Sequence, residues 1–385
     1  MHDESASGPG EQRLGGTILT PQGWRRGEIL WRDGVIAAIE GAPCDPGDHD
    51  DGIVLPGFVD LHVHGGGGAD LMEGGEALAV MARTHARFGT TSLLGTSMTA
   101  SRVCLAAALA DAGRIMASPP EDGADLPGLH LEGPFINPER LGAQPPFARP
   151  GTLEEFEALN ALAPIRVVTL APEIDGHPAL IEALAQRGVR VQIGHSDADY
   201  SQTLAALERG ASGFTHLFNA MRGLHHRGAG GVGAALAHAE YAELIADLIH
   251  VEAGALLAAR RAIPGLYAVT DATAAAGMPE GEYRLGEHRV FRRGDTVRLA
   301  DGGLAGSALT MDAAFRHLIA LGLSAAEASA RLSTLPARYL GLDDRGTLAP
   351  GRRADVVRLD ADHRVEQVVV GGRCLRRSAP FRASI

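Results

Sequence analysis

Five short apolar runs organise this sequence, and each ends on residue types that bind metal ions. The runs are Asp60–Gly65, Leu129–Pro134, Ile193–Ser196, Phe214–Met221 and Leu266–Asp271. The metal-binding residue types that they carry are His62 and His64, Glu132, His195, His216 and Asp271. Short apolar runs of this kind are typical of buried strands. Strand ends that present imidazoles and carboxylates together are expected of a metal-dependent hydrolase built on a barrel.

Strand candidates alternate with helical patterns through the middle of the chain. The strand candidates begin near Phe58, Thr90, Pro127, Arg166, Val189, Gly213, Glu243 and Leu266. Helical patterns cover 75–88, 101–116 and 152–162, and Thr152 with Glu155 and Ser324 with Glu327 fit capping boxes. Eight such repeats predict an α/β fold with parallel strands closed into a (β/α)8 TIM barrel. An open doubly wound sheet is the alternative, and polar residues at so many strand ends favour the barrel.

Both ends of the chain carry short β patterns rich in turn residues. At the front these are 15–20, 27–32 and 34–39, with the hairpin signal Asp33-Gly34 between the last two. At the back they are 354–359 and 365–370. Neither end can form a core alone. We therefore expect residues 1–56 and 347–385 to form one small, discontinuous β-sandwich domain beside a metal-dependent hydrolase barrel of residues 57–346.

Composition excludes several classes of partner and chemistry. The net charge of −12 argues against a nucleic-acid surface, and no apolar run approaches the roughly 20 residues that would cross a membrane. The three cysteines are far apart, and the N-terminus lacks a signal-peptide pattern, so we expect a cytoplasmic protein. All 35 basic residues are arginine. Schiff-base chemistry and a carbamylated lysine bridging two metals are therefore excluded.

Each motif also has a simpler interpretation. His62 and His64 lie two residues apart and would face the same side of a strand, but this pair is common in other roles. Glu132 alone could be an exposed loop residue, and His195 and His216 could be buried core residues. Two histidines and one glutamate that converge would instead give the three-ligand site of catalytic zinc. Asp271 fits either a helix N-cap or a general base.

As a set, these motifs resemble the N-acetylglucosamine-6-phosphate deacetylases, a branch of the amidohydrolase superfamily. The motifs are His130–Pro134, Gly194–Ser196, Thr215–Met221, Val269–Thr273 and Gly306–Met311, and the match extends from Leu55 to Gly351. The resemblance implies a deformed barrel, a β-sandwich made from both termini, and a homodimer. It also implies hydrolysis of N-acetylglucosamine 6-phosphate to glucosamine 6-phosphate and acetate, in amino-sugar catabolism or cell-wall recycling.

The resemblance also implies roles for individual residues. Glu132, His195 and His216 correspond to the main metal ligands, and Asp271 to the catalytic carboxylate. Implied substrate contacts are Ala143, Gln144, Asn219, Ala220, Arg227, His250, Leu304, Ala305, Gly306 and Ser307. Arg227 matches a phosphate-binding arginine that reaches across from the partner subunit, whereas its simpler interpretation is a residue of a solvated Gly-rich turn.

Two departures from the family pattern concern the metal. The chain keeps His62 and His64, as in the branch that binds two ions. Glu132 would then bridge the two ions. Gln144 stands where some members have a histidine that polarises the acetyl carbonyl, and we expect the second cation to take over part of that role. Histidine and carboxylate ligands suit Zn²⁺ first, and also Fe²⁺, Co²⁺ or Mn²⁺.

The sequence leaves two alternatives to this function. One keeps the chemistry and changes the substrate, either to N-acetylgalactosamine 6-phosphate or to an N-acyl-amino acid. The other is a non-catalytic barrel that serves as a scaffold.

Overall fold

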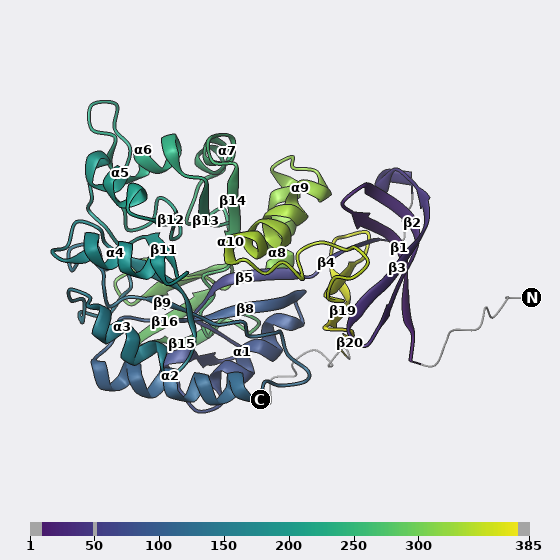
Figure 1. Ribbon diagram of the computed structural model, residues 1–385, viewed down its shortest axis with the longest axis horizontal. Helices are drawn as coiled ribbons and strands as arrows, with labels where there is room; N and C mark the ends of the chain where they lie inside the picture. The colour runs from purple at the N-terminus through teal and green to yellow at the C-terminus, as the bar shows by residue number, and fades with distance from the viewer. Residues whose placement is uncertain (1–9, 49–51, 376–385) are drawn as a thin grey trace, which may run out of the picture.

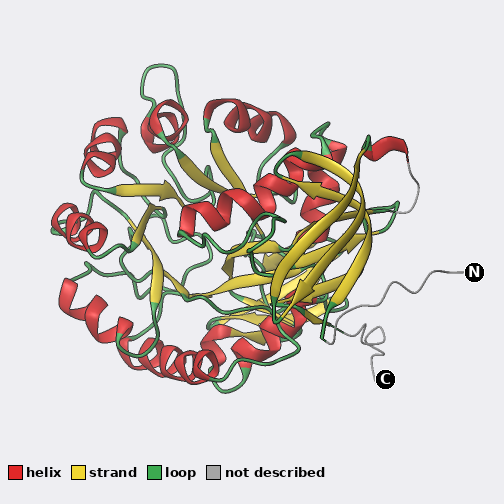
Figure 2. Cartoon of the chain, turned by 45° about the vertical axis from the view of Figure 1, so that its right-hand side comes forward, coloured by secondary structure: helices red, strands yellow, loops and turns green. Residues whose placement is uncertain are grey.

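The computed structural model describes residues 10–48 and 52–375. Within them, eight parallel strands form a barrel with its helices outside (Figure 2). The strands are β5 (Phe58–Val63), β8 (Thr90–Ser97), β9 (Leu129–Glu132), β10 (Ile165–Leu170), β11 (Arg190–Ile193), β12 (Ala211–Phe214), β13 (Tyr241–Ile245) and β14 (Gly265–Val269). β5 to β12 form one sheet, and β13 pairs with β14. The predicted barrel is confirmed, and each predicted start lies within two residues of the observed one.

Irregular hydrogen bonds close the ring where the regular ladders stop. The Leu217 N–H donates to Glu243 O at 2.9 Å, which joins the end of β12 to β13. The Asp271 N–H donates to His62 O, also at 2.9 Å, which joins the end of β14 to β5. Both closures therefore lie beside the residues singled out in the sequence, and the barrel is deformed at the end that carries them.

The helices follow the strands around the barrel. They are α1 (Ala77–Ala86), α2 (Arg102–Ala117), α3 (Leu153–Asn160), α4 (His177–Gln186), α5 (Tyr200–Glu208), α6 (Gly230–His238), α7 (Ala253–Ala262), α8 (Met311–Ala320), α9 (Ala325–Ser329) and α10 (Leu335–Leu340). The hydroxyls of Thr152 and Ser324 accept the N–H groups of Glu155 and Glu327, as predicted. Only this half of each capping box forms, because the Glu155 carboxylate accepts from Arg149 at 2.6 Å and the Glu327 carboxylate from Arg260 at 2.7 Å instead. Among the described helices, none has the length and apolar character needed to cross a membrane.

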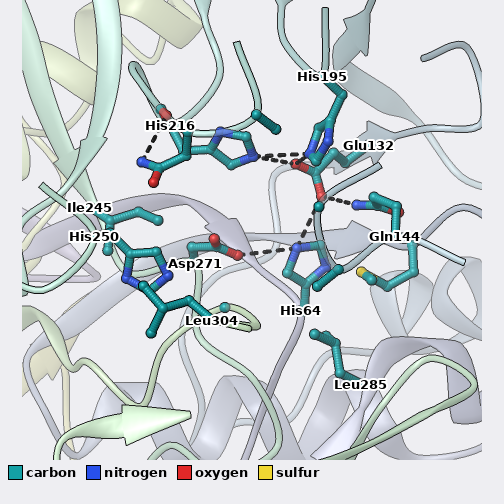
Figure 3. A pocket seen from close by; sticks show the side chains of 16 residues that line it. His64, Glu132, Gln144, His195, His216, Ile245, His250, Asp271, Leu285 and Leu304 are labelled. Atoms are coloured by element: carbon teal, nitrogen blue, oxygen red, sulfur yellow. Dashed lines mark hydrogen bonds and ion pairs between the residues drawn. The ribbon is translucent and has the colours of Figure 1, made fainter. Parts of the chain in front are cut away.

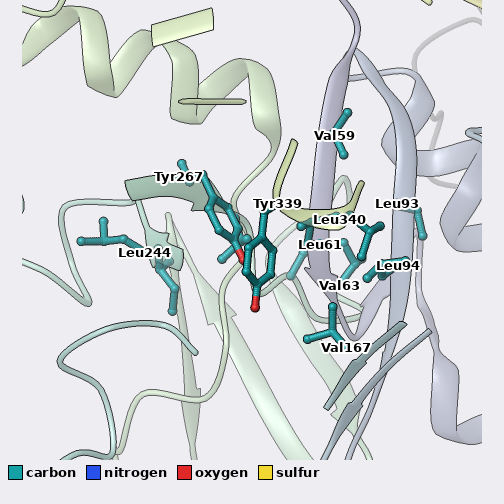
Figure 4. Close-up of a cluster of buried hydrophobic side chains, with 14 of the residues drawn as sticks. Val59, Leu61, Val63, Leu93, Leu94, Val167, Leu244, Tyr267, Tyr339 and Leu340 are labelled. Atoms are coloured by element: carbon teal, nitrogen blue, oxygen red, sulfur yellow. The ribbon is translucent and has the colours of Figure 1, made fainter. Parts of the chain in front are cut away.

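Apolar side chains fill the barrel wall and hold the strand ends in place. Val59, Leu61 and Val63 of β5 are buried in the same apolar cluster as Leu93 of β8 and Val167 of β10 (Figure 4). Burying a Val or Leu side chain stabilises the fold by about 1.5–3 kcal/mol each. The rigid wall thereby fixes where each strand ends.

A second sheet gathers strands from both ends of the chain. Its order is β20-β19-β18-β4-β1-β2-β3. The bounds are β1 (Gln12–Thr20), β2 (Gly23–Arg32), β3 (Val35–Pro43), β4 (Ile53–Pro56), β18 (Val356–Leu359), β19 (Val365–Val370) and β20 (Arg373–Cys374). The predicted pairing of the two termini is confirmed, and the sheet stands to one side of the barrel (Figure 1).

The terminal sheet folds back on itself around a small core. Asp33 and Gly34 take positive φ angles of 51° and 80°, as the predicted hairpin turn between β2 and β3 requires. The Ile36 N–H of β3 then donates to Arg352 O at 2.8 Å, which brings the first hairpin to the segment before β18. Trp31 lies inside this core at 1% exposure. The domain limits at 56/57 and 346/347 stay a prediction.

A small antiparallel sheet that the sequence analysis did not predict follows the last barrel strand. It comprises β15 (Gly281–Leu285), β16 (His288–Arg293) and β17 (Thr296–Leu299). Its inner face packs on Met98, Ala275 and Ala305. This sheet covers one side of the barrel's carboxyl end, and Leu285 reaches the cavity there.

Candidate metal centre and active site

The residues that end the apolar runs meet in one cavity at the carboxyl end of the barrel. The cavity holds about 630 Å³, part of it open to solvent. Figure 3 shows His64, Glu132, His195, His216 and Asp271 pointing toward one another at its base. They come from the ends of five strands, β5, β9, β11, β12 and β14, or from the turns that follow them, as predicted for a barrel enzyme.

Glu132, His195 and His216 form a compact triangle of ligand atoms. The Nε2 atoms of His195 and His216 lie 3.1 and 3.0 Å from Glu132 Oε1, and 3.1 Å from each other. In a tetrahedral zinc site with ligands at about 2.0–2.1 Å, neighbouring ligand atoms are separated by about 3.3 Å. The triangle therefore has nearly the size needed to hold one such cation.

A second cluster shares Glu132 with the first. The Nε2 atoms of His62 and His64 are 3.1 Å apart. His64 Nε2 lies 3.1 Å from Glu132 Oε2 and 3.2 Å from Asp271 Oδ1, and His62 Nε2 lies 3.5 Å from the same Asp271 oxygen. Glu132 thus directs one oxygen toward each cluster, which is the arrangement of a carboxylate able to bridge two cations.

For His62, His64 and His195, the other ring nitrogen explains why Nε2 is suited to a cation. Nδ1 of His64 donates to Thr96 O at 3.1 Å, and Nδ1 of His195 donates to Arg140 O at 2.8 Å. Nδ1 of His62 lies 2.6 Å from Glu243 Oε1 and donates to it. When Nδ1 carries the hydrogen, a neutral imidazole has only a lone pair at Nε2. Lone pairs that face one another and a carboxylate are stabilised by a positive ion between them.

The pKa shifts of the buried groups also favour positive charge between these side chains. Burial opposes the charge of His64, but Asp271 and Glu132 outweigh it and raise its pKa to about 9. The pKa of His62 is likewise raised well above its usual range, because Glu132 and Glu243 outweigh burial. Burial would raise the pKa of Asp271, but the neighbouring histidines hold it below its usual value. The carboxylates therefore remain ionised and attract positive charge.

His130 lies close to this centre but does not belong to it. His62, His130 and Glu243 form a third group with suitable ligand atoms. However, His130 Nδ1 donates to Leu61 O at 3.2 Å, and its Nε2 lies 2.7 Å from Thr169 Oγ1. Burial and the charge of His62 lower the pKa of His130 to about 3. Both of its nitrogens are occupied, so it is a neutral residue of the barrel core.

The backbone at three of the strand ends is held in an uncommon conformation. The φ angles of His195, His216 and Asp271 are +47°, +28° and +49°. Non-glycine residues rarely adopt positive φ, and such strain of about 1–3 kcal/mol persists where the surrounding structure enforces it. The conformation turns each side chain from its strand into the cavity.

Gln144 contacts Glu132 rather than standing free in the cavity. The Thr99 N–H donates to Gln144 Oε1 at 2.7 Å, and this fixes the orientation of the amide. Gln144 Nε2 then donates to Glu132 Oε2 at 2.6 Å. Gln144 is thus a bridge between the backbone after β8 and the carboxylate shared by both clusters.

The other predicted substrate contacts fall into three groups. Ala143, Asn219, Ala220, His250, Leu304 and Gly306 line the cavity together with Gln144. Ala305 and Ser307 are buried behind its wall, where the Ser307 hydroxyl donates to Thr270 O at 2.6 Å and its N–H to Asp271 O at 2.8 Å. Arg227 is exposed, in a turn closed by the 2.9 Å hydrogen bond from the Gly228 N–H to His225 O, and does not line this cavity. Its role from a partner subunit stays a prediction.

Several residues of the site were not predicted. Met98, Ile245 and Leu285 form an apolar part of the wall. Asp247 accepts from His250 Nδ1 at 2.6 Å and outweighs burial, which raises the pKa of His250. Glu243 holds His62 from within the barrel. A charged residue inside the otherwise apolar run Tyr241–Ile245 was the available signal for Glu243.

A barrel whose strand ends carry two histidine–carboxylate clusters defines the class of metal-dependent amide and ester hydrolases, and similarity searches agree with that class. The amidohydrolase family model matches residues 53–375, and the chain belongs to this family. It is 43% identical to the N-acetylgalactosamine-6-phosphate deacetylase of Escherichia coli O157:H7, covering 92% of this chain and 96% of that protein. It is 38% identical to the N-acetylglucosamine-6-phosphate deacetylase of Lysinibacillus sphaericus, covering 93% and 95%.

Solved structures give the same result at the level of the fold. The N-acetylglucosamine-6-phosphate deacetylase of Thermotoga maritima superposes with a TM-score of 0.86 at 32% identity, covering 95% of this chain and all of that one. A mutant of the Mycobacterium smegmatis enzyme in complex with N-acetyl-D-glucosamine-6-phosphate also gives 0.86, at 33% identity, covering 95% and 99%.

Proposed function

We propose that this chain removes the N-acetyl group of N-acetylglucosamine 6-phosphate and yields glucosamine 6-phosphate and acetate. The observation that carries the proposal is the pair of ligand clusters that share Glu132 beneath a cavity bordered by Asp271. Deacetylases of amino-sugar 6-phosphates among the relatives support the same reaction. The chain would then act in amino-sugar metabolism, and its cytoplasmic location remains part of the proposal.

Glu132, His195 and His216 would hold one divalent cation, and His62, His64 and Asp271 would hold a second together with Glu132. A bound divalent cation, with Zn²⁺ first and Fe²⁺, Co²⁺ or Mn²⁺ as alternatives, supplies Lewis acidity toward the amide carbonyl and lowers the pKa of water. The chain contributes a fixed set of lone pairs for it, because the Nδ1 atoms of His62, His64 and His195 are committed to other acceptors.

Asp271 would move the protons of the reaction. It is ionised because His62 and His64 lower its pKa, and its side chain is 10% exposed at the cavity. Its carboxylate would accept a proton from the water that attacks the acetyl carbonyl carbon. The same oxygen would then return that proton to the sugar nitrogen as the C–N bond breaks, so that a neutral amine leaves.

The cavity wall would recognise the substrate on two sides. Met98, Ile245 and Leu285 offer apolar surface to the acetyl methyl group and the sugar ring. His250 lies across the cavity, and Asp247 keeps its Nδ1 occupied, so that Nε2 is the nitrogen available to the sugar phosphate. Arg227 of a second subunit would complete the phosphate site, and the active assembly would be a homodimer.

N-acetylgalactosamine 6-phosphate is the second candidate substrate. The relative named for this substrate is 43% identical, against 38% for the Lysinibacillus enzyme that acts on the glucosamine epimer. The two sugars differ only in the orientation of one hydroxyl group, so the amide chemistry would be unchanged. An N-acyl-amino acid would leave His250 and Arg227 without a phosphate partner.

The test is acetate release from both amino-sugar phosphates, from unphosphorylated N-acetylglucosamine and from an N-acyl-amino acid. We expect release from the phosphorylated sugars, with higher kcat/KM for the native epimer, and loss of turnover in Asp271→Asn. Acetate release from the N-acyl-amino acid alone would show that the substrates are N-acyl-amino acids and not amino-sugar phosphates. A folded, cation-loaded protein that releases acetate from none of them would support the scaffold alternative.

A further inference from the structure

Glu243 is a buried carboxylate for which the proposed reaction provides no role. It lies in β13 with 0% exposure, between Ala242 and Leu244, and it does not line the cavity. A carboxylate in such surroundings is destabilising by several kcal/mol unless hydrogen bonds and opposite charge compensate it. Its contacts therefore indicate why this position carries a charge.

One oxygen of Glu243 accepts two hydrogen bonds from residues of the metal centre. His62 Nδ1 lies 2.6 Å from Glu243 Oε1, and the backbone N–H of His216 donates to the same oxygen at 3.1 Å. The first bond directs His62 Nε2 toward Glu132 and Asp271. The second supports His216 at its strained φ of +28°.

The two residues held in this way belong to different ligand clusters. His62 is part of the cluster with His64, and His216 is part of the cluster with His195. Glu132 joins the clusters from the cavity side, and Glu243 joins them from inside the barrel.

We propose that Glu243 is a positioning residue that couples the two cation sites, because its Oε1 fixes both the ring of His62 and the backbone of His216. It does not act as a ligand itself, since the third potential ligand group requires His130, whose two nitrogens are occupied. Carboxylates that hold a ligating histidine from behind typically contribute 10- to 100-fold to metal affinity. The proposal rests on the proposed function only for the presence of cations at these clusters.

The test is a chelator competition that measures Zn²⁺ and Co²⁺ affinity for wild type and Glu243→Gln. This variant keeps an oxygen acceptor and removes only the charge. We expect cation binding to the His62 cluster to weaken about 10- to 100-fold, with a smaller loss at the other cluster and a changed visible spectrum of the Co²⁺ protein. Asp355→Asn is the matched control, because Asp355 is also a buried carboxylate, at 4% exposure, but belongs to the terminal sheet region and contacts Arg353. Its cation affinities should equal those of wild type.

A double-mutant cycle distinguishes positioning from a general effect of the charge. In a His62→Ala background, Glu243→Gln should lower cation affinity only by the part of the effect that acts through His216. Fully additive losses, or wild-type affinities in Glu243→Gln, would overturn the proposal while leaving the deacetylase reaction intact. Wild-type protein that binds no divalent cation would instead overturn the proposed function. If Glu243→Gln fails to fold, Glu243→Asp, which keeps the charge on a shorter side chain, enters the same cycle.

Discussion

Gln144 offers the sharpest test of how the site is held together, through the substitution Gln144→Met. Methionine has a similar length but provides neither a donor for Glu132 nor an acceptor for Thr99. The lost bond to the charged Glu132 is worth about 1.5–3 kcal/mol, and the unpaired buried Thr99 N–H costs about 1–3 kcal/mol. Because water can enter from the cavity and replace part of these bonds, we expect the free energy of unfolding to fall by about 3 kcal/mol.

The assay is urea unfolding of the metal-stripped protein with two probes. Both tryptophans, Trp24 and Trp31, lie in β2, so fluorescence reports on the terminal sheet. Far-ultraviolet circular dichroism reports mainly on the barrel helices, and the loss should appear in this signal. A matched control is Gln186→Met at the end of α4, where the exposed amide lies 3.4 Å from Glu182. This control should stay within about 0.5 kcal/mol of wild type.

The same substitution should weaken Zn²⁺ binding, because Glu132 loses the group that orients it. We expect a 10- to 100-fold loss in a chelator competition. A Gln144→Met protein with the stability of the Gln186→Met control and unchanged Zn²⁺ affinity would refute this account of Gln144.

Three further predictions concern the cations and the phosphate. His62→Ala and His64→Ala should each lower the metal content measured by mass spectrometry by about one ion per chain and reduce the rate; unchanged content and rate would refute a second cation site. Asp247 raises the pKa of His250, so protonated His250 should aid phosphate binding until the pH rises through that raised pKa. In Asp247→Asn the pKa of His250 should be lower, and the rise of KM with pH should therefore begin at a lower pH than in wild type. Identical KM profiles would exclude this role. Arg227→Ala should raise KM about 10- to 100-fold for phosphorylated substrates, with no change for unphosphorylated N-acetylglucosamine; equal effects on both would exclude a phosphate contact.

The barrel could be predicted from the sequence because its signals are local. Each strand is a short apolar run followed by a polar residue, and a residue at a parallel strand's carboxyl end must face the same rim as its neighbours. The pairing of the termini was also predictable, since neither end holds enough apolar residues for a separate core. The sheet β15–β17 was missed because eight strand candidates had already accounted for a complete barrel.

The contacts that organise the site were less accessible to sequence reasoning. Glu243 meets His62 across 181 positions of the chain, and no local pattern encodes that distance. Gln144 lies only 12 positions from Glu132, but its contact depends on the path of the loop between them. The positive φ angles at His195, His216 and Asp271 are enforced by the surrounding structure and are not encoded by the residue types themselves. Arg227 would act between subunits, and a single chain does not contain that contact.

The most direct test of the central claim is acetate release by metal-stripped protein during stepwise addition of Zn²⁺, with N-acetylglucosamine 6-phosphate as substrate. The stripped protein should be inactive, and activity should rise with bound cation until both clusters that share Glu132 are filled. Full turnover without any divalent cation, or no turnover on either epimer after both clusters are filled, would contradict the account.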